Sequence, residues 1–318
     1  MTAARAQEPV IVVDGVSKFY GDVLGVSGVS LRLGRGVTGL VGPNGSGKTT
    51  LMNLLAGLIR PDEGRITVLG LSPDQPERLM RRLGYCTQVD AFPAGSTGRG
   101  FVVHWLVASG VAPRQARRLA DRAIARVGLL DDADRRIAGY SKGMRQRIKL
   151  AQAIAHEPDV LILDEPLGGL DPLARAEVIG VFRDLAADGC TLLVSSHILH
   201  EVDLVADTVV LMNEGYIVAE GSVRSVRAEL TTHPLQVLVR CSHAGRVASQ
   251  LVARDDVVEL RMHADRGGFV VSSRDADRLH LDLERIMLEQ GATVETIVPA
   301  DEDIQAIYDY LVSGAGGS

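Results

Sequence analysis

Short apolar runs alternate with longer segments of helical periodicity from residue 10 to about residue 228. Residues 160–163 and 191–195 form nearly continuous apolar runs, which are typical of strands buried on both faces of a sheet. Further strands are predicted at 10–13, 29–33 and 36–41, and helices at 48–59, 116–127 and 175–187. Strands that alternate with helices in this way predict an α/β domain with a mainly parallel sheet.

The pattern changes after residue 230. Strands are predicted at 235–241, 257–263, 268–273 and 293–298, and helices at 243–253 and 276–289. This βαββαβ order is that of a ferredoxin-like unit, and the glycines in the turn at 264–268 suit a hairpin. A closing helix is predicted at 301–311, followed by a frayed glycine- and serine-rich tail at 313–318. The polar stretch 229–234 therefore separates two predicted domains, 1–228 and 229–318.

Composition agrees with a folded chain of this size. The 318 residues are 46% hydrophobic and 23% charged, which excludes a disordered chain, a collagen-like fibre and a small disulfide scaffold. The net charge of −6 argues against general binding to nucleic acid.

Cysteine spacing and the length of the apolar stretches indicate the cellular compartment in which the chain is expected. Cys86, Cys190 and Cys241 are widely spaced and match no metal-binding or disulfide pattern, so a reducing cytosol is expected. Residues 1–9 lack the apolar core of a signal peptide. No stretch reaches the roughly 18 consecutive apolar residues of a membrane span, so we expect that the chain does not cross a bilayer by itself.

The segment after the strand at 36–41 fits the pattern G-x-x-x-x-G-K-[ST]. It consists of Gly42, Pro43, Asn44, Gly45, Ser46, Gly47, Lys48, Thr49 and Thr50. Its glycines allow the backbone to wrap phosphates, and the following helix directs N–H groups and its dipole toward an anion. Lys48 can then reach the β- and γ-phosphates, and the Thr49 hydroxyl can bind Mg²⁺. The alternative is an incidental glycine-rich turn, but the strand before it and the helix after it favour the phosphate site.

Two carboxylates, Asp164 and Glu165, directly follow the apolar strand at 160–163. Ligands of open parallel sheets bind outside the carboxyl ends of the strands. Asp164 is therefore placed to hold Mg²⁺ through water, and Glu165 to polarise an attacking water. An Asp-Glu pair alone is more often a helix cap or a solvated pair, so this interpretation depends on its combination with the phosphate loop.

Residues 140–147, with the sequence Tyr-Ser-Lys-Gly-Met-Arg-Gln-Arg, resemble the signature sequence of ATP-binding cassette (ABC) ATPases. The order of the other motifs agrees with that family: Tyr20, the loop 42–50, Gln88, the signature, Asp164 and Glu165, Gly168-Gly-Leu-Asp171, and His197. The resemblance covers residues 10 to about 228. It implies a P-loop NTPase fold with an N-terminal antiparallel part and a helical subdomain, and it makes the C-terminal ferredoxin-like unit an accessory domain.

The resemblance implies roles for three residues around the ATP bound by the same chain. Tyr20 would stack on adenine, and His197 would contact the γ-phosphate. Gln88 would contact Mg²⁺ and the attacking water, and would link the site to a membrane partner. Metal binding would thus involve Thr49, Gln88 and Asp164, and catalysis Glu165, Gln88 and His197. A lone tyrosine, glutamine or histidine is more often structural or solvated, so these roles depend on the motif order.

Three further residues are implied to act between two copies of the cassette. Ser141 and Gly143 would bind the γ-phosphate of the ATP held by the opposite subunit, and Asp171 would couple the two sites. Lys142 stands where the usual signature has its first glycine, and it could add charge near that phosphate. The Tyr-Ser-Lys-Gly-Met variant resembles the ATPase subunits of ABC-2 type exporters. Leu167 replaces a commoner small hydroxyl residue, and no function is attached to it.

These observations predict the ATP-binding and ATP-hydrolysing subunit of an ABC-2 type membrane exporter, with ATP and Mg²⁺ as cofactors. Expected partners are a separately encoded permease and a second cassette, either a second copy of this chain or another ABC ATPase; nucleic acid is not expected. The expected location is the cytoplasmic face of a bacterial cell membrane. The alternative is a soluble ABC ATPase that acts on nucleic acid or ribosomes. The C-terminal unit could sense a ligand, but a packing or dimer-stabilising role is favoured because it contains no ligand motif.

Overall fold

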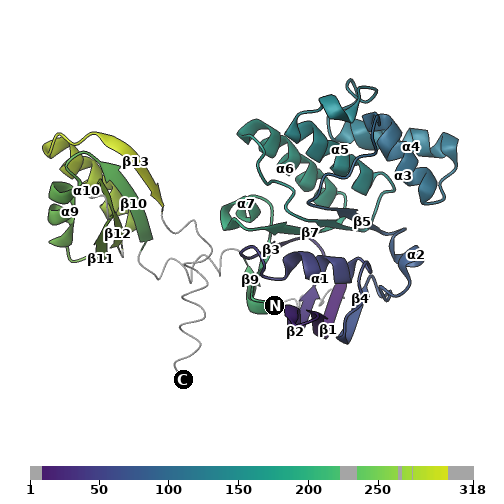
Figure 1. Ribbon diagram of the computed structural model, residues 1–318, viewed down its shortest axis with the longest axis horizontal. Helices are drawn as coiled ribbons and strands as arrows, with labels where there is room; N and C mark the ends of the chain where they lie inside the picture. The colour runs from purple at the N-terminus through teal and green to yellow at the C-terminus, as the bar shows by residue number, and fades with distance from the viewer. Residues whose placement is uncertain (1–8, 223–234, 264–266, 274, 300–318) are drawn as a thin grey trace, which may run out of the picture. The chain divides into compact units, whose positions relative to one another are not determined.

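The computed structural model describes residues 9–222, 235–263, 267–273 and 275–299. The chain divides into two compact units, Met1–Gly221 and Ser222–Ser318, which are described separately below (Figure 1). The predicted domain boundary at 229–234, the closing helix at 301–311 and the tail at 313–318 lie outside the described residues, as does most of the turn at 264–268.

A six-stranded sheet forms the centre of the first unit, in the order β5-β6-β7-β3-β8-β9. Its strands are β3 (Val37–Val41), β5 (Leu83–Cys86), β6 (Val160–Leu163), β7 (Thr191–Ser196), β8 (Thr208–Asn213) and β9 (Tyr216–Ser222). The pairs from β5 to β8 are parallel. β9 follows β8 after Glu214 and Gly215, which both have the positive φ that a tight hairpin turn requires.

The parallel strands are apolar on both faces because the sheet separates two hydrophobic cores. Within β6, Leu161 and Leu163 pack into one core, and Val160 and Ile162 into the other. This division explains the uninterrupted apolar pattern of the strand, since alternate residues point to opposite faces.

Helices cover one face of this sheet, and a helix and a second sheet cover the other (Figure 1). The helical core involves α3 (Gly98–Ala108), α4 (Pro113–Arg126), α5 (Lys142–Ile154) and α6 (Pro172–Ala187), with the 3-10 turn η1 (Ile137–Gly139). The opposite core involves α1 (Lys48–Leu55), α2 (Pro76–Leu79) and the antiparallel sheet β2-β1-β4. The short helix α7 (Leu199–Asp203) follows β7.

The antiparallel sheet is longer than its sequence pattern predicts. β1 spans Ile11–Tyr20, β2 spans Val23–Leu33 and β4 spans Glu63–Val68. Register shifts interrupt the pairing of β1 with β2, and Gly15 and Gly28 have positive φ within these strands. Such bulges break the alternation of apolar and polar residues, so only the regular ends were predictable.

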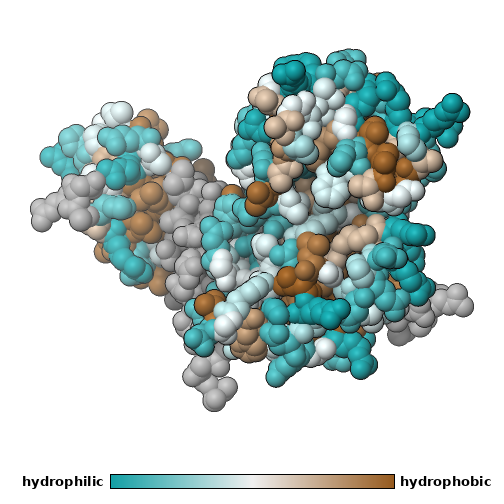
Figure 2. Space-filling view, turned by 45° about the vertical axis from the view of Figure 1, so that its right-hand side comes forward, coloured by the Kyte–Doolittle hydropathy of each residue, from teal (hydrophilic) through white to brown (hydrophobic). Residues whose placement is uncertain are grey.

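The face of the first unit that Figure 2 shows carries many hydrophilic side chains and separate apolar patches. Phe19, Tyr20 and Val23 are large apolar side chains that are exposed at the turn between β1 and β2. Within the described part of the chain, no helix combines the length and apolar character needed to cross a membrane.

The second unit has the predicted βαββαβ order. Its elements are β10 (Leu235–Cys241), α9 (Ala244–Val252), β11 (Val257–Met262), β12 (Gly268–Ser273), α10 (Ala276–Glu289) and β13 (Val294–Pro299). The sheet order is β11-β12-β10-β13 and every pair is antiparallel. One hydrophobic core, which includes Val239, Leu251, Phe269 and Leu283, lies between the sheet and the two helices.

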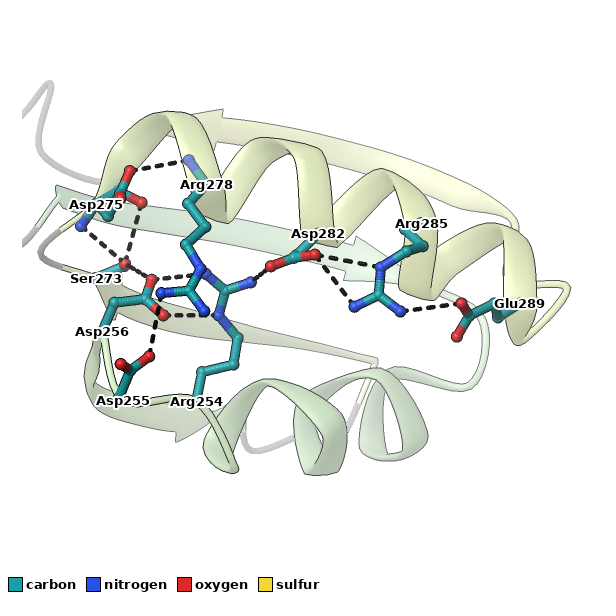
Figure 3. Close-up of polar contacts among 9 residues, drawn as sticks. All are labelled: Arg254, Asp255, Asp256, Ser273, Asp275, Arg278, Asp282, Arg285 and Glu289. Atoms are coloured by element: carbon teal, nitrogen blue, oxygen red, sulfur yellow. Dashed lines mark hydrogen bonds and ion pairs between the residues drawn. The ribbon is translucent and has the colours of Figure 1, made fainter.

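A buried ion-pair network stabilises the second unit (Figure 3). The Arg254 guanidinium donates to both oxygens of Asp256 at 2.9 and 2.7 Å, and it also contacts Asp282 on α10. Ser273 at the end of β12 donates to Asp256 at 2.6 Å. Arg254 and Asp256 are both nearly buried, so this single arginine joins the connection after α9 to α10.

Candidate active site

The loop between β3 and α1 has a backbone that only glycine can adopt at key positions. Gly47, which caps α1, has a φ of 98°, and a Cβ there would lie 2.5 Å from the carbonyl oxygen of Gly25. A Cβ on Gly42 would lie 2.4 Å from the carbonyl oxygen of Met212. The loop is thus packed tightly between β2 and β8, and the N-terminal end of α1 provides N–H groups for an anion.

Lys48 is buried inside this loop. Its ammonium donates to the carbonyl oxygens of Gly42 at 2.6 Å and Pro43 at 3.1 Å, and lies 3.8 Å from Oε1 of Glu165. Burial lowers the pKa of Lys48, while the charges of Glu165 and Asp164 oppose that shift. A cation held among carbonyl oxygens and carboxylates is well placed to neutralise phosphate oxygens.

Asp164 lies between two hydroxyl groups. Thr49 donates to its Oδ2 atom at 2.9 Å, and Ser195 donates to its Oδ1 atom at 2.8 Å. The Ser195 oxygen also accepts the backbone N–H of Glu165 at 2.8 Å. Ser195 therefore orients both carboxylate residues, a role that the sequence analysis missed. A polar residue near the end of an otherwise apolar strand was the available signal, but β6 and β7 first had to be known as neighbours.

Glu165 adopts an unusual backbone conformation, with a φ of 49°. Its side chain is only 8% exposed, and its Oε2 atom lies 2.9 Å from Nδ1 of His197, which is 45% exposed. Among the described residues, its Oε1 atom has no hydrogen-bond partner. A left-handed conformation in a residue other than glycine carries strain and occurs often at functional sites. The carboxylate therefore keeps one oxygen available for a ligand.

The polar groups present at this site fit ATP and a magnesium ion. Ser46 Oγ and Glu165 Oε1 are buried polar atoms without hydrogen-bond partners in the described structure. The described residues contain no cluster of three or more histidine, cysteine or carboxylate ligands. Mg²⁺ does not require such a cluster, because it commonly uses one or two protein oxygens together with phosphates and water. Thr49 and Asp164 supply oxygens of this kind.

Tyr20 and Gln88 lie at the edges of this group. A Cβ on Gly25 would lie 3.0 Å from both the Tyr20 ring and the Thr50 methyl group, so the half-exposed ring lies beside the start of α1. Gln88 is exposed just after β5, and the N–H of Asp164 donates to Cys86 at the end of that strand. Tyr20 thus lies beside Thr50 of α1, and Gln88 lies two residues beyond the strand end that contacts Asp164.

The predicted signature residues form a second group. Ser141 caps α5, where its oxygen accepts the N–H of Met144, and Asp171 caps α6, where it accepts the N–H of Ala174. A Cβ on Gly143 would lie 2.9 Å from the Ala174 side chain, so the two helix starts are adjacent. In the described parts of the chain, no hydrogen bond or ion pair joins Ser141, Gly143 or Asp171 to Lys48, Thr49, Asp164, Glu165 or His197.

Lys142 does not extend freely from the signature. Its Nζ atom would lie 2.0 Å from a Cβ placed on Gly169, whose φ is 65°. The ammonium therefore occupies the space beside Gly169 within the same chain. Any contribution of Lys142 to a phosphate held by another subunit would require this side chain to move.

Known proteins with similar sequence and structure support the same chemistry. A sequence model of the family described as "ABC transporter" matches residues 26–168. "Daunorubicin resistance ATP-binding protein DrrA3" of Streptomyces coeruleorubidus is 34% identical, and the match covers 96% of each chain. "Nod factor export ATP-binding protein I" of Burkholderia orbicola is 37% identical over 65% of this chain and 69% of its own length. The solved structure of cbiO1 from Clostridium perfringens, described as part of the ABC transporter complex cbiONQ, matches with a TM-score of 0.63 and 27% identity over 70% of this chain and 92% of that chain.

Proposed function

Because the chain belongs to the ABC transporter family, as an exporter subunit that binds and hydrolyses ATP to drive transport, we propose that Glu165 is its catalytic carboxylate. One observation carries this assignment. Glu165 is buried beside Lys48 and His197 and retains a carboxylate oxygen without a hydrogen-bond partner among the described residues.

Binding of the nucleotide would use three kinds of contact. The N–H groups of residues 42–50 and the ammonium of Lys48 hold the phosphates, and Tyr20 provides a surface for the adenine ring. Thr49 and Asp164 would hold Mg²⁺, Asp164 through a water molecule, with Gln88 as a further ligand. When bound, the ion neutralises the charge that develops on the phosphate oxygens. Ser195 keeps the Asp164 carboxylate oriented toward this position.

The hydrolytic step would use Glu165 and His197 together. Glu165 accepts a hydrogen bond from the attacking water and polarises it, with Oε1 as the available oxygen. His197 contacts the other carboxylate oxygen of Glu165. Its ring is partly exposed, so it is accessible to the γ-phosphate of a bound ATP. This arrangement fixes the direction of the carboxylate before the water binds, which reduces the reorganisation needed in the transition state.

A complete site would require a second cassette. Ser141 and Gly143 lie at the start of α5, where the helix N-terminus suits an anion, and Asp171 lies at the adjacent start of α6. We therefore assign Ser141 and Gly143 to the ATP of the opposite subunit and Asp171 to the coupling of the two sites. Two copies of this chain would form a two-fold interface with both nucleotides buried in it, and a related cassette could replace one copy.

Transport would require a separate permease at the cytoplasmic face of a bacterial membrane. The structural relative cbiO1 is described as part of a transporter complex, which supports assembly with other transporter subunits. The relative that matches 96% of this chain is named for daunorubicin resistance, whereas the Nod factor export relative matches 65%. We therefore favour a drug as the exported substrate.

The decisive experiment compares Glu165→Gln with the unchanged protein. Glutamine keeps the size of the side chain but cannot polarise water as a carboxylate does, so phosphate release should fall by ~10²-fold or more while ATP binding persists. Steady-state phosphate release and nucleotide affinity are measured on the same preparations. Undiminished hydrolysis would exclude Glu165 as the catalytic carboxylate.

A further inference from the structure

One face of helix α5 contacts the segment that carries Gln88. Lys149 lies on this face and is 5% exposed. Its ammonium donates to the carbonyl oxygens of Thr87 at 3.1 Å and Gln88 at 3.0 Å, and it lies 2.9 Å from Oδ1 of Asp90. An ammonium group has three protons, so these three acceptors can use all of them. The lysine thus holds both ends of a four-residue segment.

Arg145 extends this contact to the signature. It lies four residues before Lys149, on the same side of the helix. Its Nε atom donates to Oδ2 of Asp90 at 3.1 Å, and its Nη1 atom donates to the carbonyl oxygen of Tyr140 at 2.7 Å. Asp90 therefore bridges two cations of α5, and one of these also fixes the residue that precedes Ser141.

The contacts of this segment are one-sided. Cys86 still belongs to the central sheet, since it pairs with Leu163 and accepts the N–H of Asp164. Residues 87–90 differ: within the described ranges, every hydrogen bond and ion pair that they make outside their own segment goes to Lys149 or Arg145. The connection to the sheet therefore ends at Cys86, and the segment that follows it is held by α5.

We propose that Lys149, with Arg145 and Asp90, is a positioning group that holds the Gln88 segment to the signature helix α5, so that Gln88 and Ser141 move as one body. The proposal rests on the function proposed above for Gln88 and Ser141. Gln88 serves the ATP of its own chain, whereas Ser141 serves the ATP of the opposite subunit. A displacement of α5 in one subunit therefore shifts a group at each of the two ATP sites.

Lys149→Met is the direct test, because methionine is of similar length but offers no charge and no proton donor. We expect kcat for ATP hydrolysis to fall by as much as ~10²-fold, since small displacements of a catalytic group have effects of that order. The affinity for ATP should stay unchanged, because the hydrogen bonds and ion pair of Lys149 in the described structure go to residues 87, 88 and 90 and not to the phosphate loop. The full chain is used throughout. Asp90→Asn alters the side chain less and should also lower kcat. It keeps the proposal testable if Lys149→Met does not fold.

Arg82→Met is a matched control. Arg82 precedes β5, at the end of the strand opposite to Gln88, and it pairs with Asp159 at 2.7 Å on the surface. Like Lys149→Met, Arg82→Met removes a cation from a carboxylate, here one that lies beside β5 and β6. Activity should remain that of the unchanged protein. A loss equal to that of Lys149→Met would mean that any lost ion pair near β5 impairs the enzyme, and would overturn the proposal.

A double variant separates positioning from general damage. If Lys149 acts through Gln88, Lys149→Met should cause little further loss of kcat in a Gln88→Ala background. Independent and additive losses would show that Lys149 does not act through Gln88, and would overturn the proposal.

A physical readout distinguishes failure of this inference from failure of the proposed function. A nitroxide on Val89→Cys, an exposed position, reports the mobility of the segment directly. The native thiols should not be labelled, since all three are buried, and burial raises the pKa of Cys86 to about 11 and that of Cys190 to about 11. The spectrum should sharpen in Lys149→Met, and an unchanged spectrum would overturn the proposal that Lys149 holds the Gln88 segment. If Gln88→Ala alone hydrolyses ATP normally, the role of Gln88 fails, and the spectrum alone still decides whether Lys149 holds the segment.

Discussion

Ser195 on β7 donates its hydroxyl proton to Asp164, the residue directly after β6, over a distance of 2.8 Å. The bond crosses between two neighbouring parallel strands at their carboxyl ends, where the phosphate loop also begins. The hydroxyl simultaneously accepts the N–H of Glu165. One serine thus fixes the proposed metal-binding carboxylate and the backbone of the proposed catalytic residue.

Ser195→Ala should weaken the response to Mg²⁺. The substitution leaves Asp164 with one donor fewer and the Glu165 N–H without its acceptor, and such orienting contacts typically change metal affinity or activity by about 10- to 100-fold. The Mg²⁺ concentration for half-maximal hydrolysis is measured, together with the thermal midpoint as a folding control. An unchanged Mg²⁺ dependence would contradict the orienting role.

Lys48→Ala should impair the step before chemistry. The triphosphate carries several negative charges into the loop, and Lys48 is the side-chain cation that the loop holds among its carbonyl oxygens. Nucleotide affinity should fall, and hydrolysis should fall with it. Equilibrium binding of a fluorescent ATP analogue measures the first effect. Binding and turnover equal to those of the unchanged protein would remove the basis for the proposed site.

Ser141→Arg should prevent assembly but not nucleotide binding. Ser141 lies at the exposed start of α5, outside the phosphate loop, so an arginine there adds bulk to the proposed interface and removes the cap of α5, and leaves the loop unchanged. In a Glu165→Gln background with ATP and Mg²⁺, sedimentation should show a dimer when Ser141 is intact and a monomer when it is replaced. Dimers in both proteins would exclude the proposed contact between Ser141 and the opposite nucleotide.

Arg254→Met should destabilise the second unit. Removal of one partner from a buried ion pair leaves uncompensated charge and typically costs about 3 kcal/mol; here the charge is left on Asp256, since Asp282 keeps Arg285 as a partner. Calorimetry of the full chain should show a lower transition temperature for the second unit. Arg261→Met is the control, because Arg261 pairs with Glu259 in an exposed position. Equal effects of the two substitutions would contradict a special role for the network.

The same network should give the second unit an acid-sensitive stability. Hydrogen bonds from Arg254, followed by those from Ser273, lower the pKa of Asp256 to about 2 against the opposing effect of burial. Since the folded pKa lies below the unfolded value of about 3.9, the stabilisation is present above pH 4 and is lost as the pH falls toward 2. The stability difference between the unchanged protein and Asp256→Asn should therefore shrink over this range. A constant difference would contradict the assigned charge state.

The elements that could be predicted from the sequence are those whose burial is regular. β6, β10, β12 and α10 begin and end at the predicted residues, because their apolar pattern is not interrupted. β5 was not predicted, since Gly84 interrupts its apolar run; a Cβ on Gly84 would lie 2.2 Å from the carbonyl oxygen of Ala153. Close approach of a helix explains that glycine, and no local pattern reveals such an approach.

The same limit applies to the site. Lys48, Thr49, Asp164 and Glu165 belong to short motifs whose chemistry is local, and the structure places them together. Ser195 and Lys149 contact residues that lie more than thirty and more than sixty positions away, at Asp164 and Thr87 respectively. Their importance comes from strand order and helix packing, so it could be seen only after the chain was folded.

The backbone of Glu165 has a consequence for how this protein can vary. A residue other than glycine at a φ of 49° costs on the order of 1 kcal/mol, which replacement by glycine would recover. Two effects oppose that replacement: selection for turnover, and the contact of the carboxylate with the buried ammonium of Lys48, which would lose a counter-charge. The strain at this position is therefore retained together with the charge that it places beside the phosphate loop.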